Sequence, residues 1–303
     1  MKNIKVKYLL FRGILFFLRQ PIIRSITPDR WYLSGMYYLI MGQELNLRNP
    51  TLFNEKIQWL KLYNFKAEYT QMVDKYEVRK YVSQRIGEKY LVPLVGGPWD
   101  SFEDIDFELL PNQFVLKCTH DSGGVVICSD KAKLDKKKAR VKLNNSLNRN
   151  YYWGGREKPY KGIKPKIIAE KYLGNEEGKE LNDYKIMVFN GKAKCCFVCS
   201  ERFTGDSLKV TFFDLSWNKL PFERRYPMSA SPIEKPQNYE LMIELAESLA
   251  REIPFNRVDF YEEKGQVYFG EMTFYPGGGM ESFNPKEWDE IMGGWLELPK
   301  KNE

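Results

Sequence analysis

Histidine, paired cysteines and long apolar runs are scarce in this sequence, and each shortage excludes a class of protein. The chain has 303 residues, of which five are cysteine and one is histidine. An odd number of cysteines in a chain too long to need disulfide cross-links predicts reduced, buried thiols. Cys195, Cys196 and Cys199 lie in an apolar run with no second Cys or His pair, which argues against a structural zinc site.

Positive charge is also scarce beyond the first thirty residues. The formal net charge of the chain is +7, and residues 1–30 account for +6 of it, because seven basic residues there face Asp29 alone. The remaining chain carries +1. A nucleic-acid-binding protein has its positive field on the folded domain, so we expect no nucleic-acid partner.

Residues 4–26 interleave apolar residues with single basic residues. Their longest apolar run, residues 13–18, is far shorter than the roughly 20 residues of a membrane-spanning helix. No small-residue cleavage site follows it. Two interpretations remain open: peripheral contact of residues 1–26 with an anionic membrane surface, or a helix packed on the main domain. We expect a cytoplasmic protein, which under the first interpretation is peripheral on the inner face of the cytoplasmic membrane.

The most informative stretch is residues 257–279, RVDFYEEKGQVYFGEMTFYPGGG. Two aromatic and β-branched runs flank a polar turn, which predicts a β-hairpin. A turn near Gly265 places Asp259 almost opposite Glu271 on one face of the ladder. Opposed carboxylates destabilise a hairpin, and a hard cation such as Mg²⁺ would compensate them while leaving room for phosphates. Arg257 could bind a phosphate oxygen, or it could pair with a carboxylate on an exposed face.

The residues after this hairpin carry a family resemblance. An Arg-x-Asp strand followed by Glu-x-Thr-x-x-Pro-Gly resembles the metal-binding signature of ATP-grasp ligases, in which Asn usually stands at the position of Thr273. The resemblance implies that Asp259, Glu271 and Thr273 hold Mg²⁺, and that Arg257 stabilises the transferred group. Thr273 is thus a departure from the family pattern at one metal ligand, although a Thr hydroxyl is still an oxygen donor.

Residues 113–130, QFVLKCTHDSGGVVICSD, predict two strands joined by a small loop. Backbone N–H groups of Ser122, Gly123 and Gly124 can approach an anion closely, and Lys117 can place a charge on the same phosphates. Taken alone, the pattern also fits a hairpin turn with a solvated lysine. A strand lysine followed by a Gly/Ser loop is similar to the ATP-grasp lid. His120 lies in this loop, and we expect it to be exposed; contact with a phosphate or a substrate is the alternative.

Further patterns occur in the order that the family has them. Asp74-Lys75 opens a helix, and an apolar strand ends in Glu-x-x-x-Gly at residues 170–174, which resembles the adenine-binding linker. Asp183 and Lys185 stand on a predicted hairpin, near where the family binds ribose and triphosphate; an exposed edge is the alternative. The cofactor-binding residues that the resemblance implies here are Lys75, Glu170, Lys171, Leu173, Asp183 and Lys185.

The resemblance predicts an α+β ATP-grasp fold, in which two α+β subdomains grip ATP, with a helical N-terminal extension. We expect a basic segment at 1–30, a helical α/β region at 31–112, a lid subdomain at 113–173 and a C-terminal subdomain with the metal site at 174–303. The motifs and the aromatic N-terminal lead look most like the TupA-like branch, which is named for teichuronopeptide biosynthesis.

The resemblance implies an ATP- and Mg²⁺-dependent ligase that acts through an acyl phosphate in bacterial surface-polysaccharide or cell-wall polymer synthesis. Its partners would be a small-molecule or glycan carboxylate and an amine donor, with Arg257, Lys117 and Lys185 as the catalytic cations. Two alternatives remain: a glycosyltransferase or phosphotransferase of the same pathway, and a non-catalytic, membrane-tethered scaffold. The Gly277–Gly279 turn, the loop at 151–160 and the aromatic N-terminal region are candidates for binding the acceptor.

Overall fold

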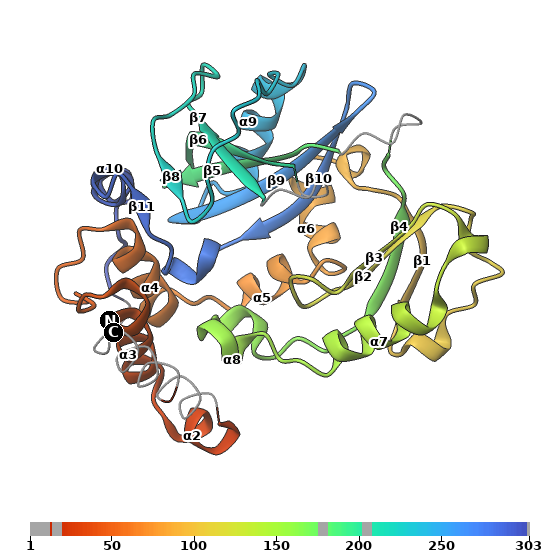
Figure 1. The fold of residues 1–303 in the computed structure, drawn as a ribbon, viewed down its shortest axis with the longest axis horizontal. Helices are drawn as coiled ribbons and strands as arrows, with labels where there is room; N and C mark the ends of the chain where they lie inside the picture. Colours follow the sequence, from red (N-terminus) through yellow and green to blue (C-terminus); the bar gives the residue numbers. More distant parts are fainter. Residues whose placement is uncertain (1–12, 14–19, 175–180, 202–207, 302–303) are drawn as a thin grey trace, which may run out of the picture.

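The chain is a mixed α+β protein with two main sheets, seen here in a computed structural model that describes residues 13, 20–174, 181–201 and 208–301 (Figure 1). The helices are α2 (Pro21–Ile26), α3 (Asp29–Met41), α4 (Phe53–Tyr63), α5 (Glu68–Val73), α6 (Val78–Arg85), α7 (Lys136–Leu147), α8 (Tyr152–Gly155), α9 (Tyr239–Leu249) and α10 (Glu287–Trp295). None of the described helices is long and apolar enough to cross a membrane. Most of segment 1–26 lies outside the described residues.

The smaller sheet has the order β1-β4-β2-β3 and is antiparallel throughout. Its strands are β1 (Leu94–Trp99), β2 (Phe114–Cys118), β3 (Val125–Cys128) and β4 (Ile167–Lys171). Side chains of β2 alternate between buried and half-buried, as a strand with one covered face requires. Helix α7 packs against β2 and β3 and covers that face, with Ala139 and Leu143 buried.

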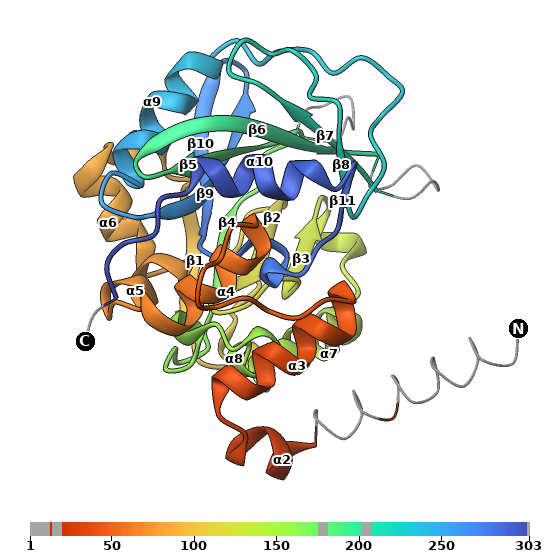
Figure 2. The ribbon, with the colours of Figure 1, turned by 90° about the vertical axis from the view of Figure 1, so that its left-hand side faces the viewer.

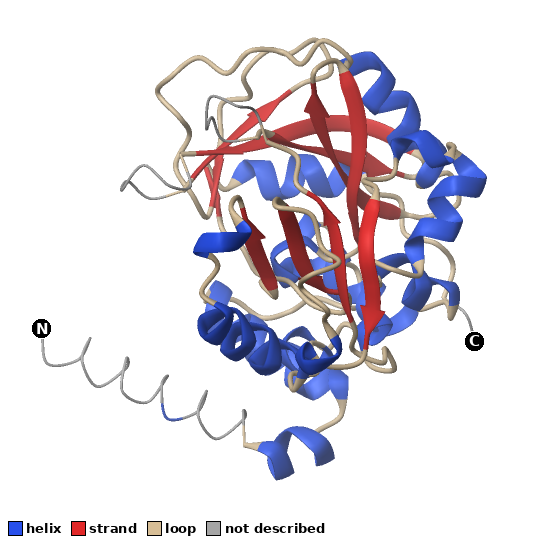
Figure 3. Cartoon of the chain, turned by 90° about the vertical axis from the view of Figure 1, so that its right-hand side faces the viewer, coloured by secondary structure: helices blue, strands red, loops and turns tan. Residues whose placement is uncertain are grey.

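The larger sheet has the order β10-β9-β5-β6-β7. Its strands are β5 (Asp183–Phe189), β6 (Lys192–Ser200), β7 (Lys209–Phe213), β9 (Phe255–Glu263) and β10 (Gln266–Thr273), and the short β8 (Glu223–Arg224) and β11 (Phe283–Asn284) pair separately. Helix α9 packs against β5, β6 and β9. Figure 2 shows α10 beside this sheet and above α4, with which it is in contact. Figure 3 shows the two sheets as separate layers.

Each sheet has its own hydrophobic core. The core of the smaller sheet includes Phe102, Leu116, Leu143 and Ile167, whereas that of the larger sheet extends from α4 to α10. Because β1 pairs with β4, the smaller sheet begins at Leu94, well before the boundary at residue 113 that we expected for the lid. Its Gly96-Gly97-Pro98 segment weakens the strand pattern, and its partner is distant in sequence. All five cysteines are free and buried, as expected, and three of them, Cys195, Cys196 and Cys199, lie on β6.

Candidate active site

The acidic hairpin forms with the predicted register. Asp259 on β9 lies opposite Glu271 on β10, and Arg257 lies opposite Thr273. Lys264 and Gly265 both have positive φ, at 52° and 76°, which is the conformation that a two-residue hairpin turn needs. A register irregularity between Phe269 and Glu271 changes the pairing beside the acidic residues.

Arg257 lies between the two carboxylates. Its Nε and Nη2 donate to the two carboxylate oxygens of Asp259, each at 2.7 Å, and Nη2 also donates to Glu271 Oε1 at 2.7 Å. Lys185, opposite Asp259 on the neighbouring β5, donates to Asp259 and pairs with Asp183 at 2.6 Å. The opposed carboxylates are therefore compensated by cations from two strands, which is the alternative to a metal that the sequence left open.

These contacts favour the charged forms of Arg257, Lys185 and Glu271. Burial alone would lower the pKa values of Arg257 and Lys185, but the carboxylates around them outweigh it and raise both. Burial alone would raise the pKa of Glu271, whereas Arg257, Lys75 and Lys185 bring it down to about 2. Burial raises the pKa of Asp259 to about 6 against the opposing effect of Arg257 and Lys185. Glu271 is thus a permanent anion at neutral pH.

The residues at the hairpin fit a magnesium ion that is held mainly by substrate. Among the described residues, no group of three or more His, Cys, Asp or Glu side chains could hold a metal. Mg²⁺ commonly takes one or two carboxylates and completes its shell with waters and phosphate oxygens, so Glu271 and the Thr273 hydroxyl suffice. Asp259 would join them only by exchanging its contacts with Arg257 and Lys185 for the ion. Glu271 is ionised and its side chain is 37% exposed, and the Thr273 hydroxyl lies 3.3 Å from its Oε1.

Two residues that the family resemblance assigns to different parts of the nucleotide are in direct contact. Lys117 Nζ on β2 lies 2.5 Å from Glu170 Oε2 on β4, and Arg79 on α6 lies 3.7 Å from the other oxygen of Glu170. All three side chains are less than one-fifth exposed. Lys171 is exposed and Leu173 half-buried, so Glu170 is the residue of the predicted adenine linker whose side chain joins the cluster.

The glycine loop between β2 and β3 packs tightly against Ser146 of α7, whose hydroxyl donates to Asp121 in the loop. A Cβ on Gly124 would come within 2.2 Å of Ser146 Oγ and 2.7 Å of Asp121 Oδ1, and Gly123 has a φ of 111°. Lys75 donates to the carbonyl of Asp121 and also lowers the pKa of Glu271. The structure therefore brings Lys75, the glycine loop and the acidic hairpin to one region, although these segments are far apart in sequence.

His120 corrects the expectation of an exposed loop histidine. Its side chain is 2% exposed, and its Nε2 lies 3.1 Å from the carbonyl of Ser146 and 3.0 Å from that of Arg149. A nitrogen between two carbonyls must carry a proton to donate to either of them. His120 thus ties the glycine loop to the end of α7, a tertiary contact that the local sequence does not reveal.

An Asp-x-Asp pattern, which sugar-nucleotide enzymes use to hold a metal, occurs at Asp104-Ile105-Asp106. In the structure Asp104 accepts hydrogen bonds from the N–H and hydroxyl of Ser101, and Asp106 accepts one from the N–H of Glu108. Both aspartates are exposed and serve local turns of the smaller subdomain. The pattern is accounted for by turn formation.

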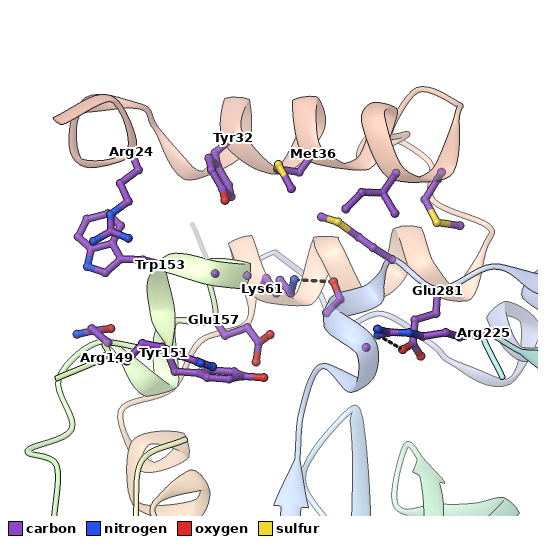
Figure 4. A pocket seen from close by; sticks show the side chains of 18 of the residues that line it. Arg24, Tyr32, Met36, Lys61, Arg149, Tyr151, Trp153, Glu157, Arg225 and Glu281 are labelled. Atoms are coloured by element: carbon purple, nitrogen blue, oxygen red, sulfur yellow. Dashed lines mark hydrogen bonds and ion pairs between the residues drawn. The ribbon is translucent and has the colours of Figure 1, made fainter. Parts of the chain in front are cut away.

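A cavity of about 1000 Å³ opens beside the hairpin (Figure 4). Its walls come from α3, from residues 149–157 and from residues 277–282. These are the three regions that the sequence nominated for an acceptor, and the structure places them around one space. The turn Pro276–Gly279 follows β10 directly, so the cavity begins within a few residues of Thr273.

Lys61 and Glu157 line this cavity, and sequence reasoning missed both. Burial lowers the pKa of Lys61 to about 8 and raises that of Glu157 to about 7, and each residue partly offsets the shift of the other. Lys61 Nζ donates to the carbonyl of Gly278 at 2.7 Å. A signal for Lys61 was available, because it falls four residues after Ile57 on the apolar face of an amphipathic helix.

Two α+β subdomains, with an Arg-neutralised carboxylate pair on one and a lysine with a glycine loop on the other, define an ATP-grasp protein. The TupA-like ATP-grasp family model matches residues 55–297, and the chain belongs to this family.

Comparison with solved structures finds distant relatives. The D-alanine–D-alanine ligase from Bacillus anthracis complexed with ATP is 18% identical, with a TM-score of 0.39 over 67% of this chain and 55% of that one. The ATP-grasp ligase PsnB complexed with minimal precursor, Mg and ADP is 9% identical, with a TM-score of 0.38 over 73% of this chain and 57% of that one. The chain thus spans little more than half the length of either structure, and no site assignment rests on them. No curated protein matches the chain.

Proposed function

We propose that this protein is an ATP-dependent ligase that joins a carboxylate to an amine through an acyl phosphate. The observation that carries the proposal is the pair Asp259 and Glu271, in register on one hairpin and bridged by Arg257. Family membership supports ATP as the nucleotide. Bacterial surface-polysaccharide or cell-wall polymer synthesis is proposed on the resemblance to the TupA-like branch alone.

The chain's own residues would act by positioning and charge neutralisation. Bound Mg²⁺ would neutralise charge on the β- and γ-phosphates, with Asp259, Glu271 and Thr273 as its protein ligands. Lys117 and the amides of residues 122–124 would steady the phosphates from the lid. Arg257, fixed by two carboxylates, would present its guanidinium where negative charge develops on the transferred phosphoryl group.

Thermal unfolding with Mg²⁺ alone, MgADP and MgATP tests the nucleotide site. A ligand at about 100 times its dissociation constant adds roughly 2.7 kcal/mol to the stability of the native state. We expect a nucleotide-dependent shift in the wild type that is lost in Glu271→Gln and kept in Glu263→Gln on the same hairpin. A full shift in Glu271→Gln, or a shift with a sugar nucleotide but not with ATP, would contradict the proposal.

We further propose that the N-terminal region contacts an anionic membrane surface from the cytoplasmic side. Ile22 and Ile26 on α2 and Trp31 on α3 are more than 70% exposed. A segment whose sequence combines seven basic residues with apolar side chains, three of which are exposed, has the composition of an interfacial anchor.

A further inference from the structure

Glu157 is a buried carboxylate for which the ATP site has no use. The residue is 6% exposed, and its carboxylate has no hydrogen-bond or ion-pair partner among the residues that the structure describes. Figure 4 shows Glu157 and Lys61 projecting toward the same part of the cavity from different elements. A Cβ on Gly278 would lie 3.9 Å from Glu157 Oε1 and 3.7 Å from Lys61 Nζ, so both groups face this glycine turn. A mostly buried carboxylate that opens into the cavity is placed to accept a hydrogen bond from a ligand bound there.

The groups around Glu157 come from several elements. Lys61 belongs to α4, Tyr151 and Tyr160 flank α8, and Tyr275 follows β10; each of these groups interacts electrostatically with the Glu157 carboxylate. Burial raises the pKa of each tyrosine, so the rings stay neutral around the carboxylate. A carboxylate beside neutral aromatic rings is suited to binding an ammonium group and to taking a proton from it near neutral pH.

The cavity also contains groups that are suited to an anion. Arg24 lies over the Trp153 ring at 5.0 Å, and Arg149 lies over the Tyr151 ring at 5.8 Å. Neither arginine has a carboxylate partner among the described residues, whereas Arg225, also at the cavity, pairs with Glu281 at 3.2 Å. Two stacked guanidinium groups without counter-ions can each hold a carboxylate or phosphate in a fixed orientation.

The cavity is also close to the phosphate side of the hairpin. Tyr151 and Tyr160 interact with Glu157 in the cavity and with Glu271 and Arg257 on the hairpin. Their ring centroids are 4.8 Å apart, so a single aromatic pair adjoins both sites. A nucleophile in the cavity would therefore be near the place where an activated carboxylate forms.

We propose that the cavity binds the amine substrate, a molecule with a primary amine and an anionic group, and that Glu157 accepts the proton of the attacking amine. This inference rests on the proposed ligase function. In the step, the amine nitrogen forms a bond to the acyl carbon, the bond from that carbon to the phosphate oxygen breaks, and phosphate leaves with the electron pair. Glu157 takes one proton of the bound ammonium, which frees the lone pair for the attack, and the second proton of the nitrogen leaves with the phosphate, so the new amide is neutral.

Matched probes distinguish binding of the amine from binding of the anionic group. Binding of glucosamine 6-phosphate and 6-aminohexanoate at millimolar concentration is compared by calorimetry with that of glucose 6-phosphate and hexanoate, in the presence of MgADP. We expect at least one amine-bearing probe to bind about tenfold more tightly than its amine-free counterpart, since ~1.4 kcal/mol is a modest value for a charge-assisted hydrogen bond in a buried site. The preference should grow as the pH rises through 7 and Glu157 becomes ionised.

Three variants test whether Glu157 binds the amine and whether Arg149 binds the anionic group. Glu157→Gln should remove the preference for the amine and its pH dependence, Arg149→Met should weaken amine-bearing and amine-free probes alike, and Glu290→Gln, an exposed residue of α10, should change neither. Equal binding of both members of each pair, or no binding of the amine-bearing probes, would overturn the inference. If MgADP still raises the melting temperature of Glu157→Gln, the nucleotide site is intact in that variant, whichever result the probes give. If MgADP does not raise the melting temperature of the wild type, the proposed function itself fails.

Discussion

The acidic hairpin and the cavity both contain buried groups of opposite charge, but they pair them differently. At the hairpin, Arg257 donates to Asp259 and Glu271, and Lys185 donates to Asp259. At the cavity, Lys61 donates to a backbone carbonyl, and no ion pair joins it to Glu157. The two regions share a low exposure to water and differ in whether each charge has a partner.

The pKa values follow this difference. At the hairpin the pKa values of Arg257 and Lys185 are raised and that of Glu271 is lowered to about 2, so their charged forms are favoured; Asp259, the most buried of the four, is the exception, with a pKa raised to about 6. At the cavity the pKa of Lys61 is lowered to about 8 and that of Glu157 is raised to about 7. A fixed charge suits the binding of phosphates, whereas a group that titrates near neutral pH suits proton transfer.

The largest effect that we expect comes from breaking the pairing at the hairpin. Arg257→Met leaves Asp259 and Glu271 opposite each other without the cation that joins them. Removing one partner of a buried ion pair costs 3–5 kcal/mol in other proteins, and we expect about 3 kcal/mol because Lys185 remains. Urea unfolding measures the loss, with Arg251→Met as an exposed control. A loss below about 1 kcal/mol would mean that the hairpin charges are as weakly coupled as surface pairs.

A smaller effect is expected on the lid side of the ATP site. Lys117→Met removes the cation nearest to Glu170 and a point charge from the phosphates. We expect MgATP to bind about tenfold more weakly, which corresponds to ~1.4 kcal/mol. Calorimetric titration measures the affinity, and Lys133→Met, whose side chain is 84% exposed, is the matched control. Unchanged affinity would remove Lys117 from the nucleotide site.

The sequence predicted the paired region well because its pattern is local. Asp259 and Glu271 are joined by one short turn, so alternation alone places them opposite each other, and the structure has this register. The contacts of Arg257 could not be read from alternation, because a long side chain can reach either a carboxylate or a phosphate. The family resemblance supplied the fold, and the family match confirms it.

The sequence nominated the three regions that form the walls of the cavity, but it did not show that they meet or which charged groups line them. These walls come from α3, from the segment around α8 and from the turn after β10, and only long-range packing brings them together. Buried His120 was missed for the same reason, since its partners lie on the carbonyls that end α7. Glu157 has no motif, and the helical spacing of Lys61 shows only that it lies on the apolar face of α4, not which groups it meets there.

Glu157 tests the comparison through the pH dependence of stability. Its pKa is about 7 in the folded protein, above the ordinary value of 4.5, so the folded state binds more protons between these two pH values. The stabilisation is complete below the ordinary pKa and is lost as the pH rises through 7. Glu157→Gln should therefore flatten the decline in unfolding free energy between pH 5 and pH 8, as urea titrations at each pH would measure. The raised pKa of Asp259 also makes the unfolding free energy decline with pH, so the quantity to compare is the difference in unfolding free energy between variant and wild type at each pH. If the two curves of unfolding free energy against pH are parallel, the raised pKa does not belong to Glu157.

The smallest effect concerns the helices that form one wall of the cavity. Arg24 on α2 and Tyr32 on α3 face the cavity, whereas Ile22 and Ile26 on α2 are exposed. Ile26→Asp should weaken sedimentation of the full chain with phosphatidylserine-containing vesicles about fivefold, because a partly inserted isoleucine contributes ~1 kcal/mol. Ser25→Asp, the same added charge at an adjacent exposed residue, is the control for electrostatics. If both variants lose the same amount of vesicle binding, the contact is electrostatic only. If neither variant loses vesicle binding, α2 lies away from the membrane. The cavity would then open to water rather than toward a membrane-bound substrate.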